Sequence, residues 1–183
     1  RQLGPVRNRA AEGTRSREKQ FNPRVENDVQ KIIRHGSNPS NYWWEVTDKS
    51  GTRRFFGGEP GNGPDAAAIL TDGAGNIAYW ALTEARDAND NFVKYRYTKV
   101  TDPGTLNGNA GYNLYLASAS YTGHGNTEGN YTVVFTRDRD LGETKRKDIS
   151  ISGRLAFTQV TAYLLRKVLL HTHGHPYLSY ERT

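Results

Sequence analysis

Short runs of aromatic and β-branched residues alternate along this chain with clusters of Gly, Asn and Asp. Residues 42–47 (Tyr-Trp-Trp-Glu-Val-Thr) have a composition that suits a pleated, half-buried strand. The turn residues 48–51 (Asp-Lys-Ser-Gly) follow, and residues 53–56 (Arg-Arg-Phe-Phe) return. We therefore predict a β-hairpin over residues 42–57. An apolar run at Val29, Ile32 and Ile33 predicts a strand before it.

An internal repeat appears when residues 71–85 are aligned with residues 86–100. The aligned pairs are Asp72 and Asp87, Gly75 and Asp90, Asn76 and Asn91, Ile77 and Phe92, Trp80 and Tyr95, Leu82 and Tyr97, and Thr83 and Thr98. Asp48 and Gly51 open the earlier hairpin in the same register. An Asp side chain can accept N–H bonds from its own turn, and Gly, Asp or Asn tolerates a left-handed backbone. Each turn-plus-strand unit cannot bury its own face, so the units must stack in an extended sheet.

The second half of the chain predicts more strands. Residues 112–121 and 131–135 flank the turn residues 122–126 and form a further pair of strands. Residues 137–147 are a charged excursion, which we assign to a surface loop, and residues 149–157 have weak strand character.

Two apolar segments are ambiguous in pattern. Residues 65–70 fit either one helical turn or a strand. Residues 160–170 fit a buried helix on periodicity alone. We prefer a strand for them, because the turn-like residues 171–176 and the run Tyr177-Leu178-Ser179-Tyr180 follow.

The composition supports an all-β fold of antiparallel hairpins stacked in an extended, repetitive sheet. Hydrophobic residues make up 35% of the 183 residues and the mean hydropathy is -0.80, so the core is thin. The 19 Gly and 11 Tyr residues favour tight turns and strands. The chain has no Cys, which excludes disulfides, thiolate metal sites and Cys nucleophiles. It also lacks an apolar run of the roughly 20 residues that span a bilayer.

The positive charge is concentrated at the N-terminus. The formal net charge is +6, and residues 1–24 hold seven basic and two acidic residues, against 18 and 17 in the remainder. We interpret residues 1–20 as a basic tail or linker and residues 21–183 as a β-rich scaffold domain, and we predict no nucleic-acid partner. Because the chain has no Met, we expect it to be a fragment of a larger protein.

The order of the motifs from about Phe21 to the C-terminus is itself a pattern. The motifs are residues 29–36, 42–52 and 56–58, then Asp72-x-x-Gly75-Asn76, Trp80, Asp87, Asn91, Tyr95-x-Tyr97, Tyr121-Thr122-Gly123, Val134-Phe135 and residues 164–168. Together they resemble the N-terminal region shared by the Salmonella virulence plasmid B protein and the B components of insecticidal toxin complexes. The sequence departs from the repeat pattern of that family at Asp90, where Gly is commoner.

The resemblance implies a scaffold that leads into the tyrosine-aspartate (RHS/YD) repeat shell of a toxin cocoon and helps to enclose or present a toxic part encoded elsewhere. It implies a secreted or extracellular location, with the rest of the same polypeptide and toxin-complex subunits as partners. The ADP-ribosyltransferase of the virulence protein is a separate C-terminal domain. Its catalytic Arg, Ser-Thr-Ser and paired-Glu motifs have no counterpart in this sequence, so we expect no enzyme activity.

Three histidines are the main candidates for chemistry. His171 and His173 are two residues apart and point the same way if they lie on one strand, and His175 follows. Three imidazoles suffice for an open zinc site. No carboxylate is adjacent to orient them, so we favour a polar turn and predict no metal.

Trp43, Trp44 and Tyr79 are candidates for stacking against sugars, and binding of host-surface glycans is the alternative function. Neighbouring residues on a strand face opposite sides, so we expect at least one Trp in the core. We favour the structural role for these aromatic residues.

Other motifs have structural explanations. Residues 57–63 (Gly-Gly-Glu-Pro-Gly-Asn-Gly) lack the Lys-Ser/Thr ending of a phosphate loop. Asp72, Asp87, Asn76 and Asn91 lie outside any calcium-binding nonapeptide, and turn capping accounts for them. Ser118, Ser120 and His124 are close only in sequence. We therefore predict no catalytic, cofactor-binding or metal-binding residue.

Overall fold

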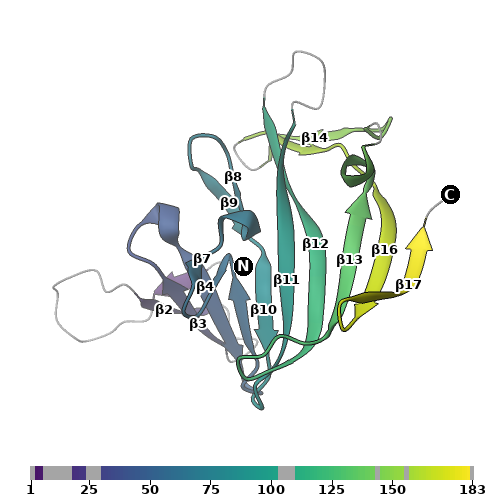
Figure 1. Cartoon of the computed structure of the whole chain (residues 1–183). Coiled ribbons are helices and arrows are strands. Elements are labelled where there is room, and N and C mark those ends of the chain that lie inside the picture. The colour runs from purple at the N-terminus through teal and green to yellow at the C-terminus, as the bar shows by residue number, and fades with distance from the viewer. Residues whose placement is uncertain are drawn as a thin grey trace.

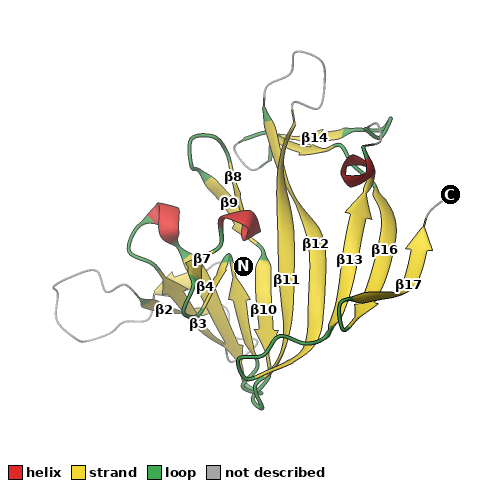
Figure 2. Cartoon of the chain, viewed as in Figure 1, coloured by secondary structure: helices red, strands yellow, loops and turns green. Residues whose placement is uncertain are grey.

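The structure is a computed structural model that describes residues 3–5, 18–23, 30–102, 110–142, 145–154 and 157–181. Within these ranges the chain consists of β-strands, turns and three short 3₁₀ segments, which confirms the all-β prediction (Figure 2). The 3₁₀ segments are η1 (Pro39–Asn41), η2 (Ala66–Ala68) and η3 (Asp138–Leu141). The strands are β1 (Leu3–Pro5), β2 (Lys19–Pro23), β3 (Gln30–His35), β4 (Trp43–Asp48), β5 (Arg53–Phe56), β6 (Gly58–Glu59), β7 (Gly63–Pro64), β8 (Ile69–Thr71), β9 (Ile77–Trp80), β10 (Leu82–Arg86), β11 (Asn91–Asp102), β12 (Gly111–His124), β13 (Tyr131–Arg137), β14 (Ser150–Ser152), β15 (Gln159–Thr161), β16 (Leu165–Thr172) and β17 (His175–Glu181).

One large twisted sheet of 13 strands dominates the molecule (Figure 1). Its main path has the order β1-β2-β3-β4-β5-β10-β11-β12-β13-β16-β17. β14 and β15 form a side branch, because β15 pairs with β14 and also, in parallel, with β12. β6–β7 and β8–β9 are separate two-stranded sheets. The predicted hairpins β4–β5, β12–β13 and β16–β17 are all confirmed.

Three turns share one set of hydrogen bonds, as the repeat predicts. The Oδ1 atom of the leading Asp accepts the backbone N–H groups two and four residues later, at Asp48, Asp72 and Asp87 alike. The fourth residue of each turn has a left-handed backbone, with φ of 82° at Gly51, 86° at Gly75 and 61° at Asp90. Since all of these bonds are local, each turn forms from its own residues.

In the middle unit of the repeat, the Asp-led turn and the strand β9 lie outside the large sheet, although we predict that the whole unit stacks in it; only residues 82–85 join the sheet, as part of β10. Its strands β8 and β9 pair with each other, and Ala81 separates β9 from β10. The Ala81 N–H donates to the Ala68 carbonyl, and the Ala81 carbonyl accepts from Gly57. This arrangement packs Leu70 in one buried cluster with Leu114 of β12. Burial of that apolar surface explains why the hairpin folds over the sheet instead of extending it.

The two faces of the large sheet differ in polarity. Directly opposed residues on neighbouring strands project to the same side, so the register sorts side chains into rows. What we term the apolar face carries Phe21, Ile32, Val46, Arg54, Ala85 and Val93, and then Tyr95, Ala119, Val133, Leu170 and Leu178. What we term the charged face carries Ile33, Glu45, Phe55, Glu84, Lys94, Ser120, Thr132 and His171.

Smaller elements cover part of each face. The β8–β9 hairpin lies over the apolar face at Tyr97, whose hydroxyl donates to the Leu82 carbonyl at 2.9 Å. Burial raises the pKa of Tyr97 to about 12. The β6–β7 hairpin lies over the charged face, where Glu59 forms an ion pair with Lys94 at 2.7 Å. Much of the apolar face remains half-exposed in this chain.

The apolar segment at residues 160–170 is extended, as predicted, but it is two strands rather than one. β15 pairs with β12 and β14, whereas β16 pairs with β13 and β17. Residues 162–164 connect them, and Ala162 is fully buried there. A single sequence does not reveal such a change of partner, because both strands have the same local pattern.

The charged excursion at residues 137–147 is not a simple surface loop. Arg137 is only 5% exposed and Asp138 only 7%. The Arg137 guanidinium lies over the Tyr115 ring at 4.9 Å and donates to the Leu116 carbonyl. A cationic side chain can be buried where an aromatic ring and a carbonyl group contact it. The sequence pattern alone does not show these contacts.

Residues 65–70, left open by their pattern, combine both alternatives as η2 followed by β8. Leu3–Pro5, within the predicted tail, pairs with β2 in the large sheet. Residues 6–17 of that tail and Val29 of the predicted first strand lie outside the described residues. Among the described residues, no helix has the length and apolarity to cross a membrane.

Candidate functional site

A polar cavity of about 390 Å³ opens on the charged face, beside the tip of the β6–β7 hairpin. Six of its lining residues are charged, three of them basic and three acidic. They are Arg53, Arg86 and Lys94, and Glu59, Glu84 and Asp90. The strands β5, β10 and β11 supply most of them, and the Asp-led turn at residues 87–91 holds β10 and β11 in register.

Asp90 joins two cations at the mouth of this cavity. Its Oδ1 atom lies 3.1 Å from Nη2 of Arg53 and 3.6 Å from Nη1 of Arg86. Arg86 also donates from Nε to Glu84 at 2.8 Å and from Nη1 to the Gly125 carbonyl at 2.7 Å. The guanidinium therefore connects β10 to the turn at residues 87–91 and to the loop after β12.

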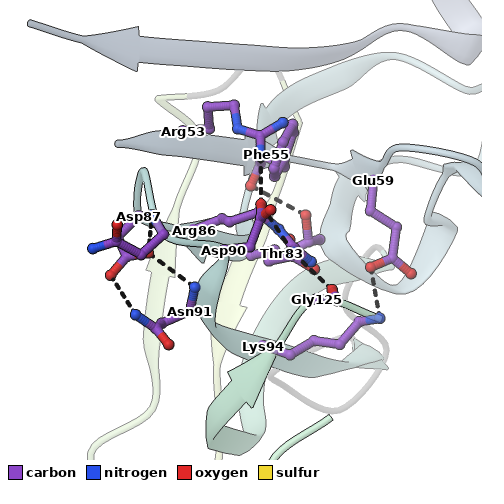
Figure 3. Close-up of polar contacts among 12 residues, drawn as sticks. Arg53, Phe55, Glu59, Thr83, Arg86, Asp87, Asp90, Asn91, Lys94 and Gly125 are labelled. Carbon is purple, nitrogen blue, oxygen red and sulfur yellow. Dashed lines mark hydrogen bonds and ion pairs between the residues drawn. The ribbon is translucent and has the colours of Figure 1, made fainter. Parts of the chain in front are cut away.

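Glu59 and Lys94 close the other side of the cavity (Figure 3). Burial raises the pKa of Glu59, but hydrogen bonds from Lys94 and Asn62 outweigh it, so the pKa lies below its usual value. Nearby, Thr83 donates to the carbonyls of Phe55 and Gly58. These contacts attach the β6–β7 hairpin to the sheet.

The cavity is electrically balanced. Each of its carboxylates lies within 3.6 Å of a basic side chain, and each ion pair links two different segments of backbone or two positions of β10. Such a network fixes the positions of the loops that it joins and disfavours packing against segments with a different charge pattern. A general acid or base, in contrast, must be available to exchange a proton with a substrate. The arrangement suits a structural role on this face.

A second hollow, of about 460 Å³, lies on the apolar face. Aromatic and aliphatic side chains make up most of its lining, with Gln30 and Arg54 as polar members. Trp44 and Trp80 meet there edge to face, with ring centroids 5.7 Å apart and an interplanar angle of 75°. Pockets with this mixture of lining residues are typical ligand sites.

The three candidate histidines lie at the β16–β17 turn. His171 is on β16 and His175 begins β17. His173 has a left-handed backbone, with φ of 51°, and its Nδ1 atom lies 3.0 Å from the Thr172 hydroxyl. Within the described part of the chain, no three His, Asp or Glu side chains gather as metal ligands would.

The aromatic candidates are separated by the fold. Trp43 is 8% exposed and stacks on His35, with centroids 3.9 Å apart. Tyr79 packs against the buried cluster around Leu70. Of these three candidates, only Trp44 lines the hollow on the apolar face. This agrees with the prediction that Trp43 and Trp44 face opposite sides of the sheet.

The remaining candidates are engaged in the fold. Asp72 and Asp87 accept hydrogen bonds from Asn76 and Asn91, which lower the pKa of both carboxyl groups. Ser120 is buried and lies 3.1 Å from the Thr132 hydroxyl. Ser118 pairs with Val134 across β12 and β13, whereas His124 lies at the end of β12, where its backbone pairs with Thr127. Residues 57–63 form the β6–β7 hairpin instead of a phosphate loop.

The charged cavity and the role of Trp80 were not predicted from the sequence. A signal for the cavity was present, because the turn at residues 87–91 sets Glu84 opposite Lys94 and Arg86 opposite Phe92. The placement of Trp80 against Trp44 had no such signal, since it depends on the β8–β9 hairpin folding over the sheet.

Comparison with known proteins identifies what the chain is similar to. The model of the family described as Salmonella virulence plasmid 65kDa B protein matches residues 5–134. No curated protein sequence gives a match.

Solved structures share this fold. The N-terminal domain of effector protein SpvB from Salmonella typhimurium strain LT2 superposes with a TM-score of 0.68 at 20% identity, over 84% of this chain and 57% of that chain. The TcdB2-TccC3 structure gives 0.65 at 15% identity, over 88% of this chain and 10% of that chain. The Photorhabdus luminescens Tc holotoxin pore gives 0.64 at 15% identity, over 85% and 9%. The chain thus spans little more than half of the first and about a tenth of the others.

Proposed function

Because this chain belongs to the family of the Salmonella virulence plasmid 65kDa B protein, we propose that it is a non-enzymatic structural module of a secreted, toxin-complex-like protein. Its role is to help enclose or present a toxic domain carried elsewhere. Its partners are the rest of its own polypeptide and other toxin-complex subunits.

The observation that carries this proposal is the edge strand β17, on whose outer side no other strand pairs among the described residues. Tyr177 is 74% exposed, Leu178 63% and Tyr180 72%. The apolar row reaches this strand through Leu170 and Leu178. An exposed, apolar edge strand is an aggregation hazard unless another strand or layer covers it. A module that continues into a larger sheet has such an edge, and a free-standing domain does not need one.

Site-specific photocrosslinking in the full-length gene product tests this role. A benzophenone amino acid replaces Tyr180 in one variant and Lys49, on the exposed turn before β5, in the control. We expect Tyr180 to crosslink within the same polypeptide or to a toxin-complex subunit, and Lys49 to crosslink much less. Equal, weak crosslinking at both positions in a folded full-length protein would contradict the proposal.

Binding of host-surface glycans is a second candidate, supported by the hollow that Trp44, Trp80 and Phe56 line together. The structure changes the residues on which this candidate rests, because Trp43 is buried and Tyr79 is half-buried against the core cluster around Leu70. A glycan array probed with the parent protein and with Trp44→Ala tests it. Binding that Trp44→Ala removes supports the candidate, whereas an array with no bound glycan removes it.

A further inference from the structure

The hollow on the apolar face has a rigid aromatic corner. Trp80 is fixed by a hydrogen bond from its Nε1 atom to the Tyr42 carbonyl at 2.5 Å. Gly57 passes beneath it with φ of 68°, and a Cβ atom there would lie 2.3 Å from Cδ1 of Trp80. The close approach holds the indole against Trp44. A preformed corner of this kind loses little conformational freedom when a ring enters it.

The surroundings of this corner are basic. Lys19, Arg34, Trp44 and Phe56 are directly opposed across β2, β3, β4 and β5, so the two cations share the row of the aromatic residues. Arg54, in the lining itself, lies 3.0 Å from Asp48. The hydroxyl of Ser50 and the Arg54 guanidinium contribute to lowering the pKa of Asp48 to about 2, so it stays ionised. Asp48 therefore pairs with Arg54, whereas the cations of Lys19 and Arg34 lie over the rings of Phe21 and Tyr42, at 5.5 and 3.9 Å from the ring centroids.

Two donors next to the hollow have no acceptor. Nε of Arg34 and Nε1 of Trp44 are buried without a hydrogen-bond partner in the described structure. Buried donors of this kind normally have partners, and an unmatched one is costly. Basic and donor groups beside an apolar corner are complementary to a ligand that carries an anionic group on a ring.

We infer that this hollow binds an acidic sugar residue, a pyranose ring that carries a carboxylate. The ring packs in the corner of Trp44 and Trp80, and the carboxylate lies toward Arg54 and Arg34. The inference rests on the glycan-binding candidate and names its ligand class. The volume of about 460 Å³ suits a ligand of one or two sugar rings.

Titration of the intact chain with 3′-sialyllactose and with lactose, followed by tryptophan fluorescence, tests the inference. We expect sialyllactose to bind at least ~10-fold more tightly, with the difference shrinking as salt screens the charges. Arg54→Gln and Arg34→Gln should each reduce the preference several-fold while leaving lactose binding in place. Leu178→Thr, at the far end of the apolar face, should change neither ligand.

Variants of Trp44 distinguish this inference from the glycan-binding candidate on which it rests. Trp44→Ala should abolish binding. Trp44→Phe keeps an aromatic ring, serves as the test if the alanine variant misfolds, and should retain the preference for the acidic sugar. Equal binding of both sugars, dependent on Trp44, overturns the acidic class but keeps glycan binding. Binding of neither sugar by the folded protein overturns the acidic class, and a glycan array with no bound glycan then removes the candidate as well. Sialyllactose binding that survives Trp44→Ala in a folded variant overturns the assignment of the acidic sugar to this hollow.

Discussion

Asp90 and Arg53 form an ion pair of 3.1 Å across the mouth of the charged cavity. Asp90 stands at the left-handed position of its turn, where Gly51 and Gly75 stand in the two related turns. The departure from Gly therefore has a structural explanation. The backbone strain of a non-Gly residue with φ of 61° is offset in part by a carboxylate that holds Arg53 and Arg86 together.

Replacement of Asp90 separates these two effects. Asp90→Gly relieves the strain and removes the ion pairs, so we expect the free energy of unfolding to stay within about 1 kcal/mol of the parent, since exposed pairs contribute little. Asp90→Ala loses the pairs and keeps the strain, so it should be about 1–2 kcal/mol less stable than Asp90→Gly. Urea unfolding measures the free energy of unfolding of both variants. An alanine variant as stable as the glycine variant would contradict the strain argument.

Asp87 caps its turn through one side chain. Its Oδ1 atom accepts the N–H groups of Asn89 and Asn91, and its Oδ2 atom accepts from Nδ2 of Asn91. We expect Asp87→Ala to lower the melting temperature by roughly 2–4 °C, because the turn loses these acceptors. Asp87→Asn keeps one acceptor oxygen and should lose less. Asn89→Ala, which preserves the backbone N–H, is the control, and an equal loss in that variant would refute the capping role.

The Glu128–Arg96 pair predicts acid sensitivity. Hydrogen bonding from Arg96 lowers the pKa of Glu128 from 4.5 to about 2. A carboxyl with a lowered folded-state pKa stabilises the fold fully above its unfolded value, and this contribution is lost as the pH falls from about 4.5 towards 2. We expect Glu128→Gln to unfold with a shallower pH dependence than the parent in that window. Parallel curves of urea midpoint against pH for the two proteins would rule this out.

Leu70 tests whether the β8–β9 hairpin is part of the core. Its side chain is fully buried in one cluster with Leu114, far along the chain. We expect Leu70→Ala to cost about 2–5 kcal/mol in free energy of unfolding, from lost burial and the cavity left behind. Leu165→Ala, at a position that is 46% exposed, should cost no more than about 0.5 kcal/mol. A Leu70 variant as stable as the Leu165 variant would show that the hairpin is not anchored in this core.

The turns and hairpins of this protein were determined by the sequence itself. Asp48, Asp72 and Asp87 bind backbone groups no more than four residues away, so their pattern predicts both the hydrogen bonds and the left-handed residue. The opposition of Trp43 and Trp44 follows in the same way from the two-residue period of a strand.

Tertiary structure alone decided which strands meet across the chain. β15 pairs with β12 whereas β16 pairs with β13. The local pattern of residues 160–170 would be the same if both strands had one partner. Trp80 reaches Trp44, 36 residues away, only because the β8–β9 hairpin folds back to bury Leu70. A local hydrogen bond depends on neighbouring residues, whereas burial depends on every surface that competes for the same core. For that reason the turns were predictable and the hollow at Trp44 and Trp80 was not.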